Sequence, residues 1–214
     1  MKIFKDRQSA GKLLTKHLQE YKGTDNVVVL AIPRGGVVVA KEVASDLNLA
    51  LDIIVTRKIG APMQPELALG AVDADGEVVW DERMINDLGL KIEDLADTVK
   101  KEVEEIKRRE KEYRHERPGL AKLIEGKEII LVDDGIATGA TTLAAVNYLK
   151  RHKAAKIVLA IPVASQEAAN KLSEKVDQLI ILETPEYFQA VGQFYEEFGE
   201  VTDEEVVELL NHGR

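Results

Sequence analysis

The sequence contains no cysteine. The chain can therefore form neither a disulfide framework nor a zinc site built on thiolates, and this composition fits a reducing compartment. No apolar run approaches the ~18 to 20 residues that span a membrane as a helix. The first residues lead into charge rather than into the apolar segment of a signal peptide. We expect a cytoplasmic chain with no membrane partner.

Basic residues are in the minority. The 29 Lys and Arg residues stand against 38 Asp and Glu residues, which gives a formal net charge of -9 and a pI near 5.1. Nucleic-acid binding relies on the neutralisation of phosphates by cations, so this balance argues against a nucleic-acid partner. Any anionic ligand must be held at a local site.

Segments of β-branched residues alternate with segments of helical periodicity along most of the chain. With 45% hydrophobic residues, the 214 residues suit one domain, 1–214. The alternation predicts an α/β fold in which a mostly parallel sheet is flanked by helices on both faces. The expected strands are 27–32, 51–56, 128–132, 156–162 and 178–182, and the expected helices are 37–47, 141–151, 166–175 and 203–210.

Three segments depart from this alternation. Residues 67–72 and 77–80 flank an Asp-Ala-Asp-Gly turn, which predicts an antiparallel hairpin beside the main sheet. Residues 82–117 are highly charged, and their helical spacing from 92 onward predicts a solvated helical insertion. Five of the nine Phe and Tyr residues lie between 187 and 198, so we expect a small C-terminal hood, about 183–214, with its own apolar core.

The most informative stretch follows the expected strand 128–132. Four branched apolar residues lead into Asp133 and Asp134, and then into a loop of small residues, 135–142. Ligands of open parallel sheets lie beyond the carboxyl ends of the strands, which is where this stretch falls. The loop amides and the hydroxyls of three threonines can wrap a phosphate.

The adjacent carboxylates suit a different ligand group. Ionised carboxylates only accept hydrogen bonds, so the pair would suit the vicinal hydroxyls of a sugar or a divalent cation that the sugar also touches. The loop is not a P-loop, because Ala140 follows Gly139 where a lysine is required, and the Gly-x-Gly-x-x-Gly dinucleotide fingerprint is absent. Taken alone, two aspartates before a glycine can also be ordinary turn chemistry.

The segment 132–141 resembles the phosphoribosyl-pyrophosphate (PRPP) motif of the type I phosphoribosyltransferases. The resemblance extends over most of the chain, and it is closest to bacterial chains described only as predicted phosphoribosyltransferases. It implies the type I fold, with a flexible-loop hairpin and a hood, and it implies that Asp133 and Asp134 contact the ribose hydroxyls. The residues that it assigns to the 5'-phosphate are Gly135, Ile136, Ala137, Thr138, Gly139, Ala140, Thr141 and Thr142.

Two further stretches resemble the parts of this family that bind pyrophosphate. The segment 32–36 is similar to the pyrophosphate loop and assigns that role to Arg34, Gly35 and Gly36. Arg57 and Lys58 are similar to the Arg-Lys pair that contacts pyrophosphate in the orotate and adenine enzymes. Alone, each stretch is more often a tight turn or a solvated strand end.

The resemblance also implies a reaction and its cofactor. The 5-phosphoribosyl group of PRPP would pass to a nitrogenous acceptor with release of pyrophosphate, assisted by Mg²⁺ that is held largely through the substrate, with Asp133 as a protein contact. The catalytic residues would be Asp133, Asp134, Arg57 and Lys58. A mobile loop within 59–69, shaped by Gly60, Pro62 and Pro65, would close over the site, with Glu66 as a weaker candidate for proton transfer. We expect a homo-oligomer, in particular a dimer.

Departures from the family pattern bear on the acceptor. Ala137 stands where enzymes for 6-oxopurines carry a third carboxylate, which argues against hypoxanthine and guanine, and Ala61 replaces the second lysine of the orotate-type loop. Candidates for stacking on a base are Leu179, by its position after Val-Asp-Gln, and Phe188 in the expected hood. Three alternatives stay open: a PRPP or nucleotide sensor without catalysis, an assembly role of the helix 92–117, and hydrolysis of PRPP.

Overall fold

The structure is a computed structural model that describes residues 3–62, 64–115 and 117–211. Its main sheet has five strands in the order β2-β1-β6-β7-β8, and every neighbouring pair is parallel. The strands are β1 Val27–Ala31, β2 Ala50–Ile53, β6 Glu128–Val132, β7 Lys156–Val163 and β8 Gln178–Glu183. All five strands expected in the main sheet are therefore confirmed.

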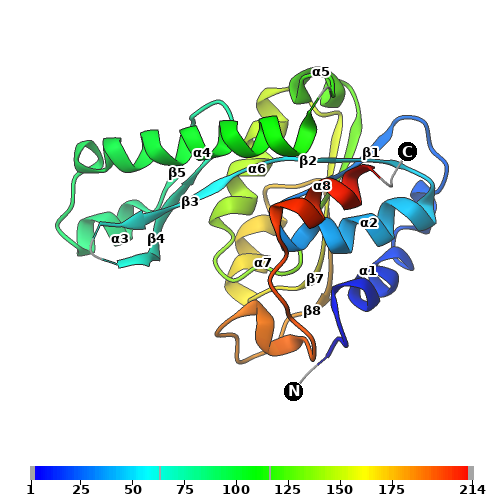
Figure 1. The fold of residues 1–214 in the computed structure, drawn as a ribbon. Helices are drawn as coiled ribbons and strands as arrows, with labels where there is room; N and C mark the ends of the chain where they lie inside the picture. The colour runs from blue at the N-terminus through cyan, green and yellow to red at the C-terminus, as the bar shows by residue number, and fades with distance from the viewer. Residues whose placement is uncertain (1–2, 63, 116, 212–214) are drawn as a thin grey trace.

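Helices cover both faces of this sheet (Figure 1). On one face, α1 Arg7–Thr15, α2 Gly35–Leu47 and α8 Asp203–Asn211 pack on alternate strand residues such as Val29, Ile130 and Val132. On the other face, α5 Leu120–Ile124, α6 Ala140–Arg151 and α7 Gln166–Ser173 pack on the intervening residues, such as Leu30 and Leu131. Successive strand side chains point to opposite faces, so the central strands are apolar at nearly every position.

A second sheet of three antiparallel strands projects from the main body, with helix α4 lying along it (Figure 1). Its strands are β3 Arg57–Ala61, β4 Gln64–Val72 and β5 Val78–Trp80, and α3 Glu82–Asp87, the 3-10 turn η2 Ile92–Leu95 and α4 Ala96–Arg114 follow. The pairing of β4 with β5 confirms the expected hairpin. Helix α4 confirms most of the helix that the spacing from residue 92 onward predicts.

Strands β3 and β4 take up much of the segment 59–69, within which the sequence predicts a closing loop. Ile59 pairs with Gly70, and Ile59 and Leu69 are fully buried, so most of the segment forms the paired strands β3 and β4. The backbone of Gly60 lies against that of Pro65, where a Cβ would overlap the Pro65 carbonyl oxygen. Glycine and proline here serve a close approach of two strands. Closure of this segment over the site stays a prediction. The side chain of Glu66 lies outside the described part.

Ionic contacts attach this second sheet and α4 to the main body, and two of them reach buried carboxylates. At the end of α4, Arg114 donates two hydrogen bonds of 3.0 Å to the buried carboxylate of Asp52 on β2. At the β4–β5 turn, Arg151 at the end of α6 donates to the buried carboxylate of Asp73 at 2.6 Å. Both contacts have one partner in the second sheet or α4 and one in the main body.

The C-terminal hood has the apolar core expected of it. Phe4, Phe194 and Tyr195 are buried there, with Phe188 packed against them. The chain near Phe4 pairs with this segment, since the Glu196 N–H donates to the Phe4 carbonyl oxygen at 2.9 Å. The hood is thus joined to the first residues of the described chain. Within the described residues, no helix is long and apolar enough to cross a membrane.

Candidate functional site

The acidic pair and the glycine pair meet at the carboxyl edge of the main sheet. Neighbouring strands β1 and β6 end in register at Ala31 and Val132, and the two loops leave side by side. A Cβ on Gly35 would overlap Asp134 Oδ2, and one on Gly36 would lie 2.9 Å from the Asp133 Cα. Only glycine allows this approach. The peptide bond between Pro33 and Arg34 is cis.

The loop after the acidic pair encloses a cavity of about 200 Å³. Lys58 and Ala68 from the second sheet and Val191 from the hood complete its wall. The loop residues that line it are Gly135, Ile136, Ala137, Thr138, Gly139, Ala140, Thr141 and Thr142. Segments that are far apart in the sequence therefore surround the loop predicted to bind phosphate.

Loop geometry is set at both of its ends. The Ile136 N–H donates to the Val163 carbonyl oxygen at 2.9 Å, and its own carbonyl accepts from the Ser165 N–H at 2.9 Å, so Ile136 anchors the loop on β7. Gly139 has a φ of 76° and caps α6, whose N-terminal dipole points at the cavity. The buried Thr142 Oγ1 has no hydrogen-bond partner among the described residues. A buried hydroxyl without a partner suits a ligand that supplies an acceptor.

The two carboxyl groups lie in a low-dielectric setting. Burial raises the pKa of Asp133 well above its ordinary value, and the charge of Asp134 raises it further. Burial also raises the pKa of Asp134, against the opposing effect of Arg7. A ligand that supplies hydroxyl donors or a cation would stabilise the ionised form of both carboxyl groups.

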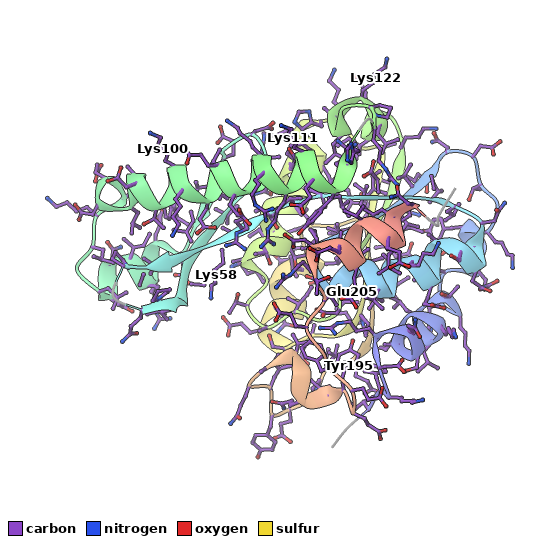
Figure 2. All side chains as sticks on the ribbon, in the orientation of Figure 1. Lys58, Lys100, Lys111, Lys122, Tyr195 and Glu205 are labelled. Atoms are coloured by element: carbon purple, nitrogen blue, oxygen red, sulfur yellow. The ribbon has the colours of Figure 1, made fainter. Side chains whose placement is uncertain are left out.

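The structure separates the cations predicted to bind pyrophosphate. Lys58 lines the loop cavity and lies on the side of β3 away from α4 (Figure 2). Arg57 faces the other way, with its Nε 2.7 Å from Glu102 Oε2 on α4. Adjacent strand residues point to opposite faces, so the pair cannot act side by side. Arg34 pairs with Glu200 at 2.6 Å and lies 3.6 Å from Asp203.

The structure places Leu179, a predicted base-stacking residue, away from the loop cavity. Leu179 is half-buried, pairs with Leu159 near the start of β8 and packs against the core cluster on this face, whereas the site lies at the other end of the strands. Phe188 lies in the hood with its ring 4.9 Å from that of Phe194, and it packs in the same cluster as Val191, which borders the cavity.

Two residues that sequence reasoning missed contact Asp134. The Arg7 Nε donates to Asp134 Oδ2 at 2.7 Å, and the Tyr195 hydroxyl, in the hood (Figure 2), donates to the Asp134 carbonyl oxygen at 2.6 Å. Asp6 and Ser9 form a capping box that marks the start of α1 in the sequence. No local signal connects Arg7 to a carboxylate that follows it by 127 residues.

The protein offers few ligands for a metal. Over residues 3–62, 64–115 and 117–211, no group of three or more His, Asp or Glu side chains could hold a metal ion. Mg²⁺ binds readily through one or two carboxylates together with substrate phosphates. Asp133, which lines the cavity, provides one such carboxylate.

Comparison with known proteins agrees with this arrangement. A family model for the phosphoribosyl transferase domain matches residues 4–196. Two curated Mycobacterium tuberculosis proteins, named provisionally as phosphoribosyl transferases, are 40% identical over 99% of this chain. The chain spans about half, 47%, of their length.

Solved structures show the same fold. The crystal structure of TT1426 from Thermus thermophilus is 40% identical, covers 98% of both chains and superposes with a TM-score of 0.79. A Neisseria gonorrhoeae protein crystallised with ppGpp shares the fold at 14% identity, with a TM-score of 0.54 over 100% of this chain and 98% of that one. On the family match and these identities, the chain belongs to the phosphoribosyl transferase domain family.

Proposed function

We propose that the protein transfers the 5-phosphoribosyl group of PRPP to a small nitrogenous acceptor and releases pyrophosphate, with Mg²⁺ as cofactor. One observation carries the proposal: the Gly35–Gly36 pair lies against Asp133 and Asp134, beside the loop cavity that is lined by Thr142, whose buried hydroxyl has no partner among the described residues. These three features supply adjoining subsites for a diphosphate, a ribose and a 5'-phosphate.

Each subsite matches the chemistry of its ligand group. The loop amides, the α6 dipole and the Thr142 hydroxyl would hold the 5'-phosphate. Asp133 and Asp134 would accept hydrogen bonds from the ribose hydroxyls. The pyrophosphate would face the amides of Gly35 and Gly36 and the ammonium of Lys58. Because glycine has no side chain, the ligand can approach the backbone closely.

The reaction would be a displacement at C1 of the ribose with inversion, through a transition state of oxocarbenium character. The bond from C1 to pyrophosphate breaks while the bond from C1 to the acceptor nitrogen forms, and the pyrophosphate takes the electron pair. Lys58 and the glycine amides would stabilise that growing charge, and Asp133 and Asp134 would hold the ribose in place. A bound Mg²⁺ would add Lewis-acid stabilisation of the leaving group.

The acceptor is constrained by what the loop lacks. Ala137 lines the cavity with a methyl group, so the loop provides no carboxylate there to take a proton from a 6-oxopurine. The half-buried ring of Phe188 is the remaining candidate for stacking on a flat acceptor. We propose a nitrogenous base other than hypoxanthine or guanine.

A second candidate function is a PRPP sensor without turnover. Its support is that both arginines that the sequence predicts to bind pyrophosphate are held by carboxylates, Arg34 by Glu200 and Arg57 by Glu102. Such pairing would leave PRPP binding possible while weakening stabilisation of the leaving group.

Pyrophosphate release separates the two functions. The purified protein is given PRPP and Mg²⁺ with a panel of purine, pyrimidine and small amine acceptors, and pyrophosphate is followed with time. Release that depends on one acceptor supports the transferase and names its substrate. PRPP binding without release from any mixture contradicts it in favour of the sensor. Release with no acceptor added points instead to hydrolysis.

We also propose that the protein is a cytoplasmic homodimer. Light scattering of the purified protein tests the dimeric state.

A further inference from the structure

The start of α1 lies where the N-terminal residues cross the hood. The Ile3 and Phe4 N–H groups donate to the Phe194 carbonyl oxygen at 3.0 Å, and the Glu197 N–H donates to the Lys5 carbonyl oxygen at 2.8 Å. Just beyond this crossing, Asp6 caps α1 by accepting from the Ser9 N–H at 2.7 Å. The backbone of Arg7, the first residue of α1, is thereby fixed between the hood and the main body.

The guanidinium of Arg7 contacts both of these parts. Its Nε donates to Asp134 Oδ2 at 2.7 Å, and its Nη1 donates to the Gly199 carbonyl oxygen at 2.8 Å. Its Cζ lies 3.8 Å from the centre of the Phe198 ring. On another side it lies close to Gly35, where a Cβ would come within 2.9 Å of Nε. The Arg7 side chain is only 11% exposed.

We propose that Arg7 is a positioning residue that fixes the carboxylate of Asp134 in the ribose subsite and couples it to the hood segment Phe198–Gly199. The inference rests on the proposed function, since it assigns a purpose to a contact of the proposed ribose-binding pair. The sequence motif does not contain Arg7, which reaches the pair only through the fold.

An arginine is required here by geometry as well as by charge. The contacts run in two directions in the guanidinium plane, to a carboxylate and to a carbonyl, while the Phe198 ring lies over the guanidinium. A lysine ammonium is a point charge on a flexible stem and cannot satisfy both directions and stack. Arg7→Lys therefore keeps the charge and removes the coupling.

The coupling has a consequence for ligand binding. Without the Arg7 guanidinium, the Asp134 carboxylate would lose the orientation that the ribose hydroxyls need. Lys58 and the loop amides would be unaltered. We expect affinity for ribose 5-phosphate to fall by about tenfold or more in Arg7→Lys, as for loss of a hydrogen bond to a charged group. Affinity for inorganic pyrophosphate should fall much less.

Calorimetric titration of the full chain with ribose 5-phosphate, pyrophosphate and PRPP tests the inference. The matched control is Arg117→Lys, because Arg117 is as buried, at 13% exposure, and donates to the Leu51 and Leu210 carbonyl oxygens without touching the site. It should lose thermal stability and keep all three affinities. Phe198→Leu, at a partly exposed position, removes only the ring and should weaken ribose 5-phosphate binding by about two- to fivefold.

The outcomes separate the inference from the function beneath it. A selective loss of ribose 5-phosphate and PRPP affinity in Arg7→Lys, with a smaller loss in Phe198→Leu, supports positioning. Equal losses for ribose 5-phosphate and pyrophosphate, or no loss, overturn it while wild-type PRPP binding keeps the proposed function standing. A wild-type protein that binds neither ribose 5-phosphate nor PRPP overturns both.

Discussion

Arg57 and Glu102 form an ion pair between β3 and α4, with 2.7 Å between the Arg57 Nε and the Glu102 Oε2. Their side chains are 33% and 15% exposed, so the pair is partly screened by water. The helical insertion therefore holds one of the cations that the sequence predicts to bind pyrophosphate. We propose that Glu102 competes with that ligand for Arg57.

Glu102→Gln should release Arg57 and tighten pyrophosphate binding. An ion pair this exposed contributes about 1 kcal/mol or less, so the gain should not exceed about fivefold. Glu105→Gln is the matched control, since Glu105 also lies on α4 but pairs with Arg108 and Arg109. Calorimetry that finds unchanged or weaker pyrophosphate binding in Glu102→Gln would show that Arg57 has a structural role alone.

Gly35→Ala should abolish most PRPP binding, because the new Cβ would overlap Asp134 Oδ2. Displacing that carboxylate costs about 1–3 kcal/mol, a loss of about ten- to hundredfold in affinity. Gly119→Ala is the control, because a Cβ there meets nothing within 4 Å and φ is -52°. If both variants bind PRPP like the wild type, the glycine loop does not form part of the site.

Thr142→Val separates ligand binding from stability. The buried hydroxyl has no partner among the described residues, so its replacement by a methyl group should leave the free energy of unfolding unchanged or raise it. PRPP affinity should nevertheless fall by about ten- to hundredfold, because a hydrogen bond to a phosphate is lost.

Thr15→Val provides the opposite case. The Thr15 hydroxyl is equally buried but donates to the Gly11 carbonyl oxygen at 2.8 Å. Its loss should cost about 1 kcal/mol of stability and leave PRPP binding intact. Denaturant melts and titrations that rank the two variants in the reverse order would contradict the assignment of Thr142.

Asp133→Asn should stabilise the ligand-free protein at neutral pH. Burial raises the pKa of Asp133 above its ordinary value near 3.8, so the ionised side chain costs folding energy at any pH above its folded pKa. The advantage of the variant should shrink as the pH falls from the raised folded pKa towards 3.8, because the wild-type carboxyl becomes neutral. Melting temperatures of both proteins are measured across that interval without ligand. A variant that is less stable than the wild type at neutral pH would show that the surroundings stabilise the carboxylate and would contradict this prediction.

The sequence predicts those features that depend on local periodicity. Alternating β-branched and helical segments are enough to place the five parallel strands, and the contiguous motif from Asp133 to Thr142 marks the loop that encloses the cavity. The strand pair β3–β4 was missed because Gly60 and Pro65 are ordinarily signs of a loop, whereas here they permit a close backbone contact.

Features that depend on distant contacts could not be predicted in the same way. Arg34 and Arg57 were expected to act with Lys58. The side-chain alternation of β3 and the carboxylate of Glu102 set the direction of Arg57, and the carboxylate of Glu200 sets that of Arg34. Those partners are 166 and 45 residues away in the sequence.

Calorimetric titration of the purified protein with PRPP in the presence of Mg²⁺ tests the central claim most directly, with Asp133→Asn and Asp134→Asn measured beside the wild type. An amide keeps the shape of each side chain and removes its charge and half of its acceptor capacity. The account predicts saturable binding by the wild type and a loss of about tenfold or more in each variant. Equal binding by all three proteins, or none by the wild type, would contradict the assignment of this edge of the sheet as a PRPP site.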